Sequence, residues 1–217
     1  MKKTHTSIIY FLILSVTKLI FKLFYNFRVF GKTHWISGGA LLAPNHVSFL
    51  DPPAVAISCP GSIHFLARDS LFKGFLGILI KRLNTHPIHQ GGANLNLMKK
   101  ISQLLKEGKK VLLFPEGTRS VDNKVSALQP GLGLLISMSK AAIIPMYING
   151  TFKVWGRGKR FPKPWGKIAV VIGSPILWGD YASMDKKKAQ SLMTQKLEAS
   201  LNLLRKWYEE GAKGTPP

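Results

Sequence analysis

The sequence predicts an α/β fold, in which a mainly parallel central sheet is flanked by helices and preceded by a membrane-associated helical segment. Short apolar runs at 40–43, 109–113, 143–148 and 167–172 have the length of strands, and helical patterns separate them. Strands that alternate with helices are typical of a parallel sheet covered on both faces. A chain of 217 residues is long enough for one such domain with a full core.

The first element is an apolar segment from Ile8 to Phe27, which Lys18 and Lys22 interrupt. A membrane span needs about 20 apolar residues, and a lysine near its midpoint costs at least ~2.5 kcal/mol on insertion scales. We therefore expect a monotopic helix that lies in one leaflet, with its lysines at the headgroups. A single transmembrane anchor is the alternative.

The remaining helices follow from apolar periodicity. Residues 94–107 place apolar side chains on one helical face, and Gly108 ends the pattern. Further helices are expected at 52–58, about 69–82, 132–140 and 184–209. We expect three regions: a membrane-associated segment at 1–30, one domain at 31–210 and a flexible tail at 211–217.

The charge of the chain indicates an anionic partner. Lys and Arg number 31 against 10 Asp and Glu, which gives a net charge of +21 and a pI near 10.3. No helix-turn-helix, zinc spacing or aromatic-rich sheet motif indicates nucleic acid, so an anionic membrane surface is the expected partner. Residues 152–167 interleave Trp, Arg and Lys, and we expect this loop to contact lipid headgroups. A solvated loop is the alternative.

A histidine and an aspartate lie in the segment Asn45–Asp51, directly after the first expected strand. Asp51 precedes Pro52, and an Asp cap followed by Pro is typical of a helix start. We therefore expect His46 on a loop and Asp51 at the start of the helix. A carboxylate there can accept the ring N–H, fix the tautomer and stabilise the imidazolium. The pair is a candidate general base, although such pairs also occur as plain structural contacts.

A second candidate segment, Phe114–Ser120, follows the expected strand at 109–113. Gly117 allows a close backbone approach, and Arg119 is suited to binding a phosphate bidentately, with the Thr118 hydroxyl as a further donor. Glu116 adds an acceptor for a substrate hydroxyl or for Arg119. Taken alone, this segment is also compatible with a surface turn that carries an Arg–Glu pair.

Together, and in this order, the two segments resemble the glycerolipid acyltransferases, the family of 1-acylglycerol-3-phosphate acyltransferases. That family carries Asn-His, four residues and Asp, and then a Phe-Pro-Glu-Gly-Thr-Arg block about as far downstream as here. Asn45–Asp51 and Phe114–Ser120 match both blocks in full. A weaker block, a short apolar strand with an internal proline, resembles 143–148 with its Pro145. The resemblance covers roughly residues 30 to 175.

The resemblance implies the glycerolipid acyltransferase fold and an O-acyltransferase, with 31–210 as its acyltransferase domain. An acyl chain would pass from acyl-CoA or from acylated acyl carrier protein to the sn-2 hydroxyl of the lysophospholipid 1-acylglycerol-3-phosphate (lysophosphatidic acid). The product is phosphatidic acid in phospholipid biosynthesis, at the cytoplasmic face of the membrane (the inner membrane in a bacterium). His46 would be the general base, worth about 10²–10⁴-fold, and Asp51 would orient it. The implied substrate-binding residues are Asn45, Glu116, Gly117, Thr118, Arg119 and Pro145.

The implied chemistry needs few further groups. The leaving thiol has a pKa near 8.5 and needs little help, so no metal or organic cofactor is required. The oxyanion needs a donor, for which backbone N–H groups near the helix after Asp51 or near Gly117 are candidates.

One block departs from the family pattern. Between the two motifs the family usually has a strand that ends in an Arg, which helps to hold the substrate phosphate. The corresponding stretch here is 87–92, with Gln90 at the expected Arg position. A neutral amide cannot replace charge-assisted bonds, so an acceptor with a different headgroup stays open. The missing charge has four candidate sources: Arg68, Lys73, Lys81 and Arg82.

Two other functions stay open. Ser48 lies between His46 and Asp51, and a His–Ser–Asp set can form an acyl-enzyme. Ser48 lacks the Gly-x-Ser-x-Gly elbow, however, and a hydroxyl bonded to the loop backbone is the simpler role. A non-catalytic lipid-binding protein is the other alternative. The apolar stretch at 71–80 could line an acyl-chain tunnel or pack in the core.

Overall fold

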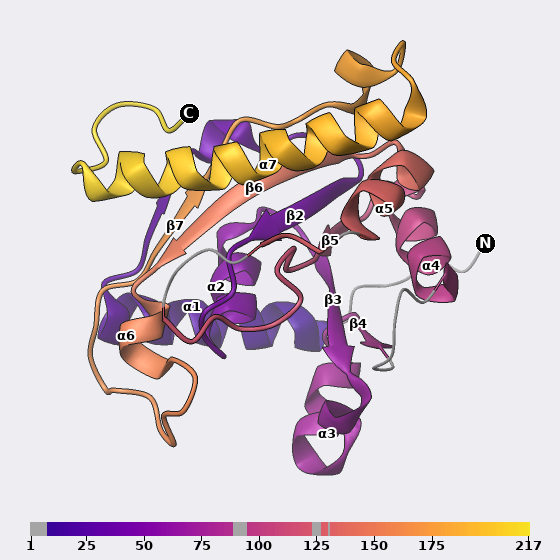
Figure 1. Cartoon of the computed structure of the whole chain (residues 1–217). Coiled ribbons are helices and arrows are strands. Elements are labelled where there is room, and N and C mark those ends of the chain that lie inside the picture. The colour runs from indigo at the N-terminus through magenta and orange to yellow at the C-terminus, as the bar shows by residue number, and fades with distance from the viewer. Residues whose placement is uncertain (1–7, 89–94, 123–126, 130) are drawn as a thin grey trace.

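The structure is a computed structural model that describes residues 8–88, 95–122, 127–129 and 131–217. Within these residues one sheet has the strand order β1-β7-β6-β2-β5-β3-β4 (Figure 1). Every neighbouring pair is parallel except β6 and β7, which are antiparallel. The bounds are β1 Arg28–Phe30, β2 Ala40–Pro44, β3 Ile63–Arg68, β4 Thr85–Ile88, β5 Lys110–Leu112, β6 Ala142–Asn149 and β7 Ala169–Ile172. The mainly parallel α/β sheet is therefore confirmed.

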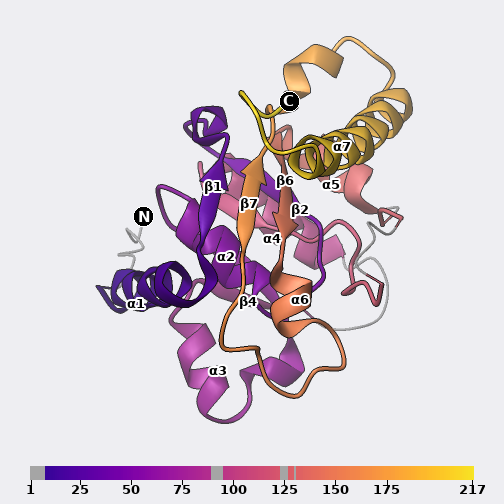
Figure 2. The same cartoon turned by 90° about the vertical axis from the view of Figure 1, so that its left-hand side faces the viewer.

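Helices cover both faces of this sheet. Figure 2 shows α1 and α2 on one side and α5 and α7 on the other. The bounds are α1 Ile8–Tyr25, α2 Asp51–Ser58, α3 Gly74–Lys81, α4 Leu95–Lys106, α5 Gly131–Ser139, α6 Thr151–Trp155 and α7 Lys186–Glu209. Asp185 begins α7 as its N-cap, because its side chain accepts the N–H groups of Lys187 and Lys188.

Strand β2 shows why the sheet must be covered twice. All five of its residues are buried. Successive side chains point to opposite faces, so Leu42 packs with α1 and α2 while Leu41 and Ala43 pack with α4, α5 and α7. A central parallel strand with no polar face requires this arrangement.

The parallel strands bring the two motifs to one edge of the sheet. Strands β2, β3 and β5 run in the same direction, so the segments that follow them leave at the same edge. The His46 loop follows β2, the Arg119 segment follows β5, and Arg68 ends β3. Helices α3 and α6 also lie at this edge (Figure 1). In open α/β sheets, ligands bind outside the carboxyl ends of the strands.

The helix expected at about 69–82 is interrupted in the structure. Residues Asp69–Phe72 form a 3₁₀ turn, and α3 begins only at Gly74. Lys73 is extended and Gly74 has φ +63°, a left-handed conformation that glycine adopts without strain. The expected single helix is thus wrong at residue 73.

Two short strands and one short helix were not expected from the sequence. Strand β1 begins with an exposed arginine, and β3 contains His64 and ends in Arg68. Neither has a clear apolar alternation, so pairing with neighbouring strands decides its conformation. Helix α6 lies within the segment 152–167 and its flank, where only a loop was expected.

Helix α1 packs on α2 and leaves most of its surface open. Tyr10, Phe21 and Tyr25 are buried, and the hydroxyl of Tyr10 accepts the backbone N–H of Ile63 at 3.0 Å. Among the described residues, Ile8–Tyr25 is a helix long and apolar enough to cross a membrane, judged by length and composition.

The last residues, expected as a flexible tail, contact the sheet. Pro216 is buried, and the carbonyl of Pro217 accepts the N–H of Ser174 at 3.1 Å. The N–H of Ser174 lies just beyond β7, where no further strand pairs with it. The C-terminal segment therefore provides an acceptor for the N–H of Ser174, which forms no hydrogen bond within the sheet.

Candidate active site

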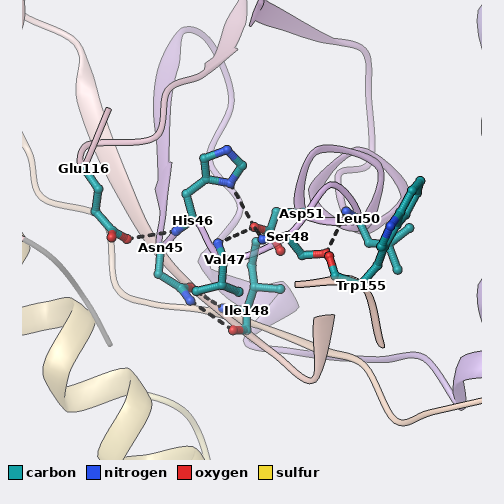
Figure 3. A network of polar contacts seen from close by, with 9 residues as sticks. All are labelled: Asn45, His46, Val47, Ser48, Leu50, Asp51, Glu116, Ile148 and Trp155. Atoms are coloured by element: carbon teal, nitrogen blue, oxygen red, sulfur yellow. Dashed lines mark hydrogen bonds and ion pairs between the residues drawn. The ribbon is translucent and has the colours of Figure 1, made fainter. Parts of the chain in front are cut away.

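His46 and Asp51 form a hydrogen-bonded pair at the end of β2. The Nδ1 atom of His46 lies 2.9 Å from Oδ2 of Asp51 (Figure 3). The aspartate is completely buried, whereas the His46 side chain is 17% exposed. With Nδ1–H donated to the carboxylate, Nε2 is the nitrogen left to accept a proton. No described residue forms a hydrogen bond with Nε2. This is the arrangement expected of an oriented base.

Asp51 holds the histidine loop and does not cap the helix. Its Oδ2 also accepts the backbone N–H groups of Val47 and Ser48, both at 2.7 Å. The N-cap residue of α2 is Leu50, and no side chain caps the first turn. The expected capping role is therefore wrong, because the carboxylate turns back to three donors of the preceding loop. These donors converge on one oxygen and fix the orientation of the imidazole.

Glu116 supports the backbone of His46. Its Oε1 accepts the N–H of His46 at 2.8 Å (Figure 3), and its side chain is buried. The N–H of Ser120 donates to the carbonyl of His46 at 2.8 Å. Both backbone groups of the histidine are thus bonded by the second motif. This bond gives Glu116 a positioning role at the backbone of His46.

Two further residues expected at the substrate are used within the fold. The amide of Asn45 accepts the N–H of Ile148 at 2.7 Å and donates to its carbonyl at 3.1 Å. Asn45 is buried and ties the histidine loop to β6. Pro145 is buried inside β6, opposite Ala43 of β2. The structure therefore places neither side chain where a substrate can contact it.

Two of the candidate oxyanion donors form hydrogen bonds within the fold. Gly117 has φ +74° and donates its N–H to the carbonyl of Phe114 at 3.0 Å, which makes a tight turn. At the start of α2, Pro52 and Pro53 have no N–H. The N–H of Ala54 bonds to Leu50. The N–H groups of Gly117 and Ala54 are thus engaged within the fold.

Aromatic rings arrange the side chains around the loop. The ring of Phe114 stacks on His46 with centroids 3.7 Å apart. The guanidinium carbon of Arg119 lies 3.6 Å from the ring centroid of Phe49. The ring centroids of Phe49 and Trp155 are 5.2 Å apart. Sequence reasoning assigned no role to Phe49 or Phe114. Their positions inside the two motif segments were the only signal.

Arg119 combines partial burial with a crowded positive environment. Its Nη1 atom is buried and has no hydrogen-bond partner among the described residues. Partial burial lowers the pKa of Arg119, and the charge of Arg157 lowers it further, while Asp51 raises it and Arg68 again lowers it. Arginine remains charged under such shifts. A guanidinium with an unpaired N–H in a positive field is suited to an anion.

The other predicted residues within the described ranges lie at the surface. Thr118 is exposed, and so are Arg68, Lys73, Lys81 and Arg82. The charge of Arg68 acts on Arg119, which agrees with Arg68 as a source of positive charge near the motif. Gln90 lies outside the described residues. No group of three or more metal-binding side chains occurs in the described ranges.

Ser48 has a structural place in the loop. Its hydroxyl donates to the carbonyl of Trp155 at 2.7 Å and accepts the N–H of Leu50 at 3.1 Å. The residue is completely buried. Both hydrogen-bonding directions are in use, so this hydroxyl is not presented to an acyl donor.

A model of the acyltransferase family matches residues 26–149. The chain belongs to the acyltransferase family. This acyltransferase is 27% identical over 190 residues to the 1-acyl-sn-glycerol-3-phosphate acyltransferase of Bacillus subtilis, with 86% of this chain and 92% of the relative covered.

Two further comparisons agree with this result. The chloroplastic 1-acyl-sn-glycerol-3-phosphate acyltransferase LPAT1 of Arabidopsis thaliana is 26% identical and covers 73% of the acyltransferase chain, which spans 45% of that relative. The crystal structure of the 1-acyl-sn-glycerophosphate acyltransferase PlsC from Thermotoga maritima superposes with a TM-score of 0.68 at 22% identity. The superposition covers 88% of this chain and 78% of the PlsC chain. That structure has the same fold, and the acyltransferase is an enzyme.

Proposed function

We propose that this O-acyltransferase transfers a fatty acyl chain from acyl-CoA or acyl carrier protein to the sn-2 hydroxyl of 1-acylglycerol-3-phosphate, giving phosphatidic acid. The names of the relatives support the acceptor. The observation that carries the proposal is the His46–Asp51 contact, with Nδ1 engaged by the buried carboxylate and the ring partly exposed.

The residues fit direct transfer of the acyl group. Nε2 of His46 takes the proton of the acceptor hydroxyl as the oxygen attacks the thioester carbonyl. Asp51 stabilises the imidazolium that forms. A C–O bond forms, the C–S bond breaks, and the leaving thiolate takes the proton from the imidazolium. Arg119, whose side chain is partly exposed, binds the acceptor phosphate.

The membrane partner is an anionic bilayer at the cytoplasmic face. The apolar residues of α1 that remain exposed are Ile8, Phe11, Leu12, Val16, Leu19, Ile20, Leu23 and Phe24. Trp165 stacks on Phe24 at 5.6 Å, and both Trp165 and Phe161 are exposed. An apolar helix face beside a basic loop suits the interface of an anionic membrane. The packing of α1 on α2 supports the monotopic arrangement over a span.

The test uses purified protein, a labelled acyl thioester and a panel of lysophospholipids. We expect labelled phosphatidic acid from 1-acylglycerol-3-phosphate and little product from acceptors with choline or ethanolamine headgroups. Acyl-CoA and acylated acyl carrier protein are supplied as the donor in separate assays. Preference for another headgroup would replace the proposed acceptor, and binding without any product would favour a lipid-binding protein.

A matched pair of histidine variants isolates the chemistry. His46→Ala removes the base and should lower kcat by about 10²–10⁴-fold. His34→Ala is the control, because His34 bonds to the carbonyl of Ile172 in another part of the sheet. Vesicle binding should stay the same in both. Comparable activity of the two variants would contradict the role of His46.

A further inference from the structure

A short turn after α6 is bonded to the catalytic loop at several points. Ser48 and Gly156 form an isolated antiparallel bridge, and the Ser48 hydroxyl donates to Trp155. Trp155 in turn contacts the ring of Phe49. A Cβ atom on Gly156 would lie 2.7 Å from the carbonyl oxygen of Phe152 in α6, so the turn that ends α6 requires glycine. The turn is therefore held against the loop that carries His46.

Arg157 is the first side chain beyond this bridge. Gly156 precedes it, and Gly158 follows it with φ +88°, so the backbone turns sharply on the far side. Its Nη1 donates to the carbonyl of Arg119 at 3.4 Å. Arg157 is otherwise exposed. The Arg157 guanidinium thus contacts the backbone of Arg119, which comes from a distant segment of the chain.

The charges around this point favour an anion. Arg157 lowers the pKa of Arg119 more than any other neighbouring charge does. Like charges held together are unfavourable unless a negative group lies between them. A phosphate accepts several charge-assisted hydrogen bonds at once, and arginine forks match its oxygens.

We propose that Arg157 is a second phosphate-binding residue, which together with Arg119 grips the phosphate of the lysophospholipid acceptor. This inference rests on the proposed function. It also supplies positive charge for a site whose expected arginine is replaced by Gln90 in the sequence. Two arginines from different segments select an anionic headgroup over a zwitterionic one.

The geometry favours the acceptor phosphate over the phosphates of coenzyme A. In glycerol 3-phosphate the phosphate lies one carbon away from the carbon that bears the sn-2 hydroxyl. A group that binds this phosphate must therefore lie close to His46, as the turn paired with Ser48 does. The phosphates of coenzyme A are separated from the thioester by the long pantetheine arm. They lie far from His46 while the thioester is at the base.

The first arm of the test is kinetic. Arg157→Gln should raise the KM for 1-acylglycerol-3-phosphate about tenfold, since one set of charge-assisted bonds is lost. The KM for acyl-CoA and kcat should change by less than about twofold. Arg157→Lys keeps the charge without the fork and should recover part of the loss. A rise confined to the KM for acyl-CoA would overturn the assignment to the acceptor.

The second arm measures binding without turnover. Calorimetric titration of sn-glycerol 3-phosphate into His46→Ala protein should show weaker binding when Arg157→Gln is added. Arg160→Gln is the matched control, because it removes the same charge three residues along, where the guanidinium lies over Phe161. The affinity of that variant for the soluble phosphate should stay the same. Equal losses of glycerol 3-phosphate affinity in both variants would show that Arg157 acts only through its long-range charge, and would overturn the proposal.

The two arms separate the inference from the proposed function. Loss of glycerol 3-phosphate binding in Arg157→Gln supports the phosphate site even if another acyl acceptor is used. If Arg157→Gln transfers the acyl group normally with an unchanged KM for 1-acylglycerol-3-phosphate, the inference is overturned and the proposed function stays intact. Sedimentation with phosphatidylglycerol vesicles should give the same bound fraction for Arg157→Gln and Arg160→Gln. A selective loss for Arg157→Gln would assign its role to the membrane surface and overturn the proposal.

Discussion

Glu116 accepts the backbone N–H of His46 at 2.8 Å, although 70 positions separate the two residues in the chain. The carboxylate of the second motif therefore holds the histidine of the first. Ser120 completes this support at the histidine carbonyl. The two motifs form one unit, in which the second motif sets the position of the imidazole and also provides Arg119.

Glu116→Ala tests this support. It leaves a buried N–H unsatisfied, so we expect a loss of about 1–3 kcal/mol in the free energy of unfolding. A displaced base should also lower kcat by at least about tenfold. Denaturant unfolding and steady-state kinetics measure the two effects. Glu209→Gln, which breaks an exposed ion pair with Arg205 on α7, is the control and should change neither. Full activity of Glu116→Ala would show that the bond is dispensable.

Asp51→Asn separates the charge of Asp51 from its hydrogen bonds. The amide oxygen can still accept bonds from the loop, so we expect the fold to persist. The neutral side chain cannot stabilise the imidazolium, and kcat should fall by about 10²–10⁴-fold with a similar KM. Asp51→Ala removes the acceptor for three donors and should also lower the melting temperature. An active Asp51→Asn enzyme would contradict the proposed role.

The pair formed by His64 and His86 predicts a loss of stability in acid. The two rings are hydrogen-bonded at 2.9 Å. Burial, followed by the charge of Lys100 and by His64, lowers the pKa of His86 from 6.5 to about 4. Burial also lowers the pKa of His64. The unfolded chain takes up these protons first, so this contribution to stability is complete above pH 6.5 and is lost as the pH falls toward about 4.

His86→Gln should flatten this dependence, because glutamine can bond to His64 but does not titrate. Melting temperatures of the wild type and the variant between pH 7 and pH 4 provide the measurement. The carboxylates that titrate in the same range contribute equally to both curves, so their contribution cancels in the difference between the two melting temperatures. Parallel curves would rule out His86 as a source of acid sensitivity.

Two tryptophans of the segment 152–167 should respond differently to replacement. Trp165 is 68% exposed, and Trp165→Ser should weaken binding to anionic vesicles with little effect on unfolding. Trp155 is half-buried against Phe49 and donates its Nε1–H to Lys159. Trp155→Ser should therefore lower activity and melting temperature more than vesicle binding. Vesicle sedimentation and acyl-transfer assays distinguish the two patterns.

The sequence predicted the elements whose evidence lies within a few residues. The strands at β2 and β6, the amphipathic helix α4 and the pairing of His46 with Asp51 all follow from local spacing. Arg119 was predicted as a phosphate ligand because the motif is contiguous. The break at Lys73 was missed because a left-handed glycine does not disturb the apolar pattern around it.

Two of the predicted substrate-binding residues have long-range partners. Asn45 bonds to Ile148 across 103 positions, and Glu116 bonds to His46 across 70. A polar residue inside a motif is equally suited to a substrate and to a distant backbone group. Only the strand order, which places β6 beside β2, decides between these uses. The meeting of Arg157 with Arg119 depends on the same folding of distant segments.

Helix α1 is fastened to the rest of the molecule near both of its ends. Tyr10 bonds to Ile63 close to one end, while Phe24 accepts the N–H of Gly166 and Tyr25 donates to Lys163 at the other. The helix therefore cannot pivot alone. In the proposed monotopic arrangement, a lipid layer that tilts α1 would therefore tilt the whole enzyme, and bilayer thickness and curvature would set the height of the His46 imidazole relative to the glycerol backbone.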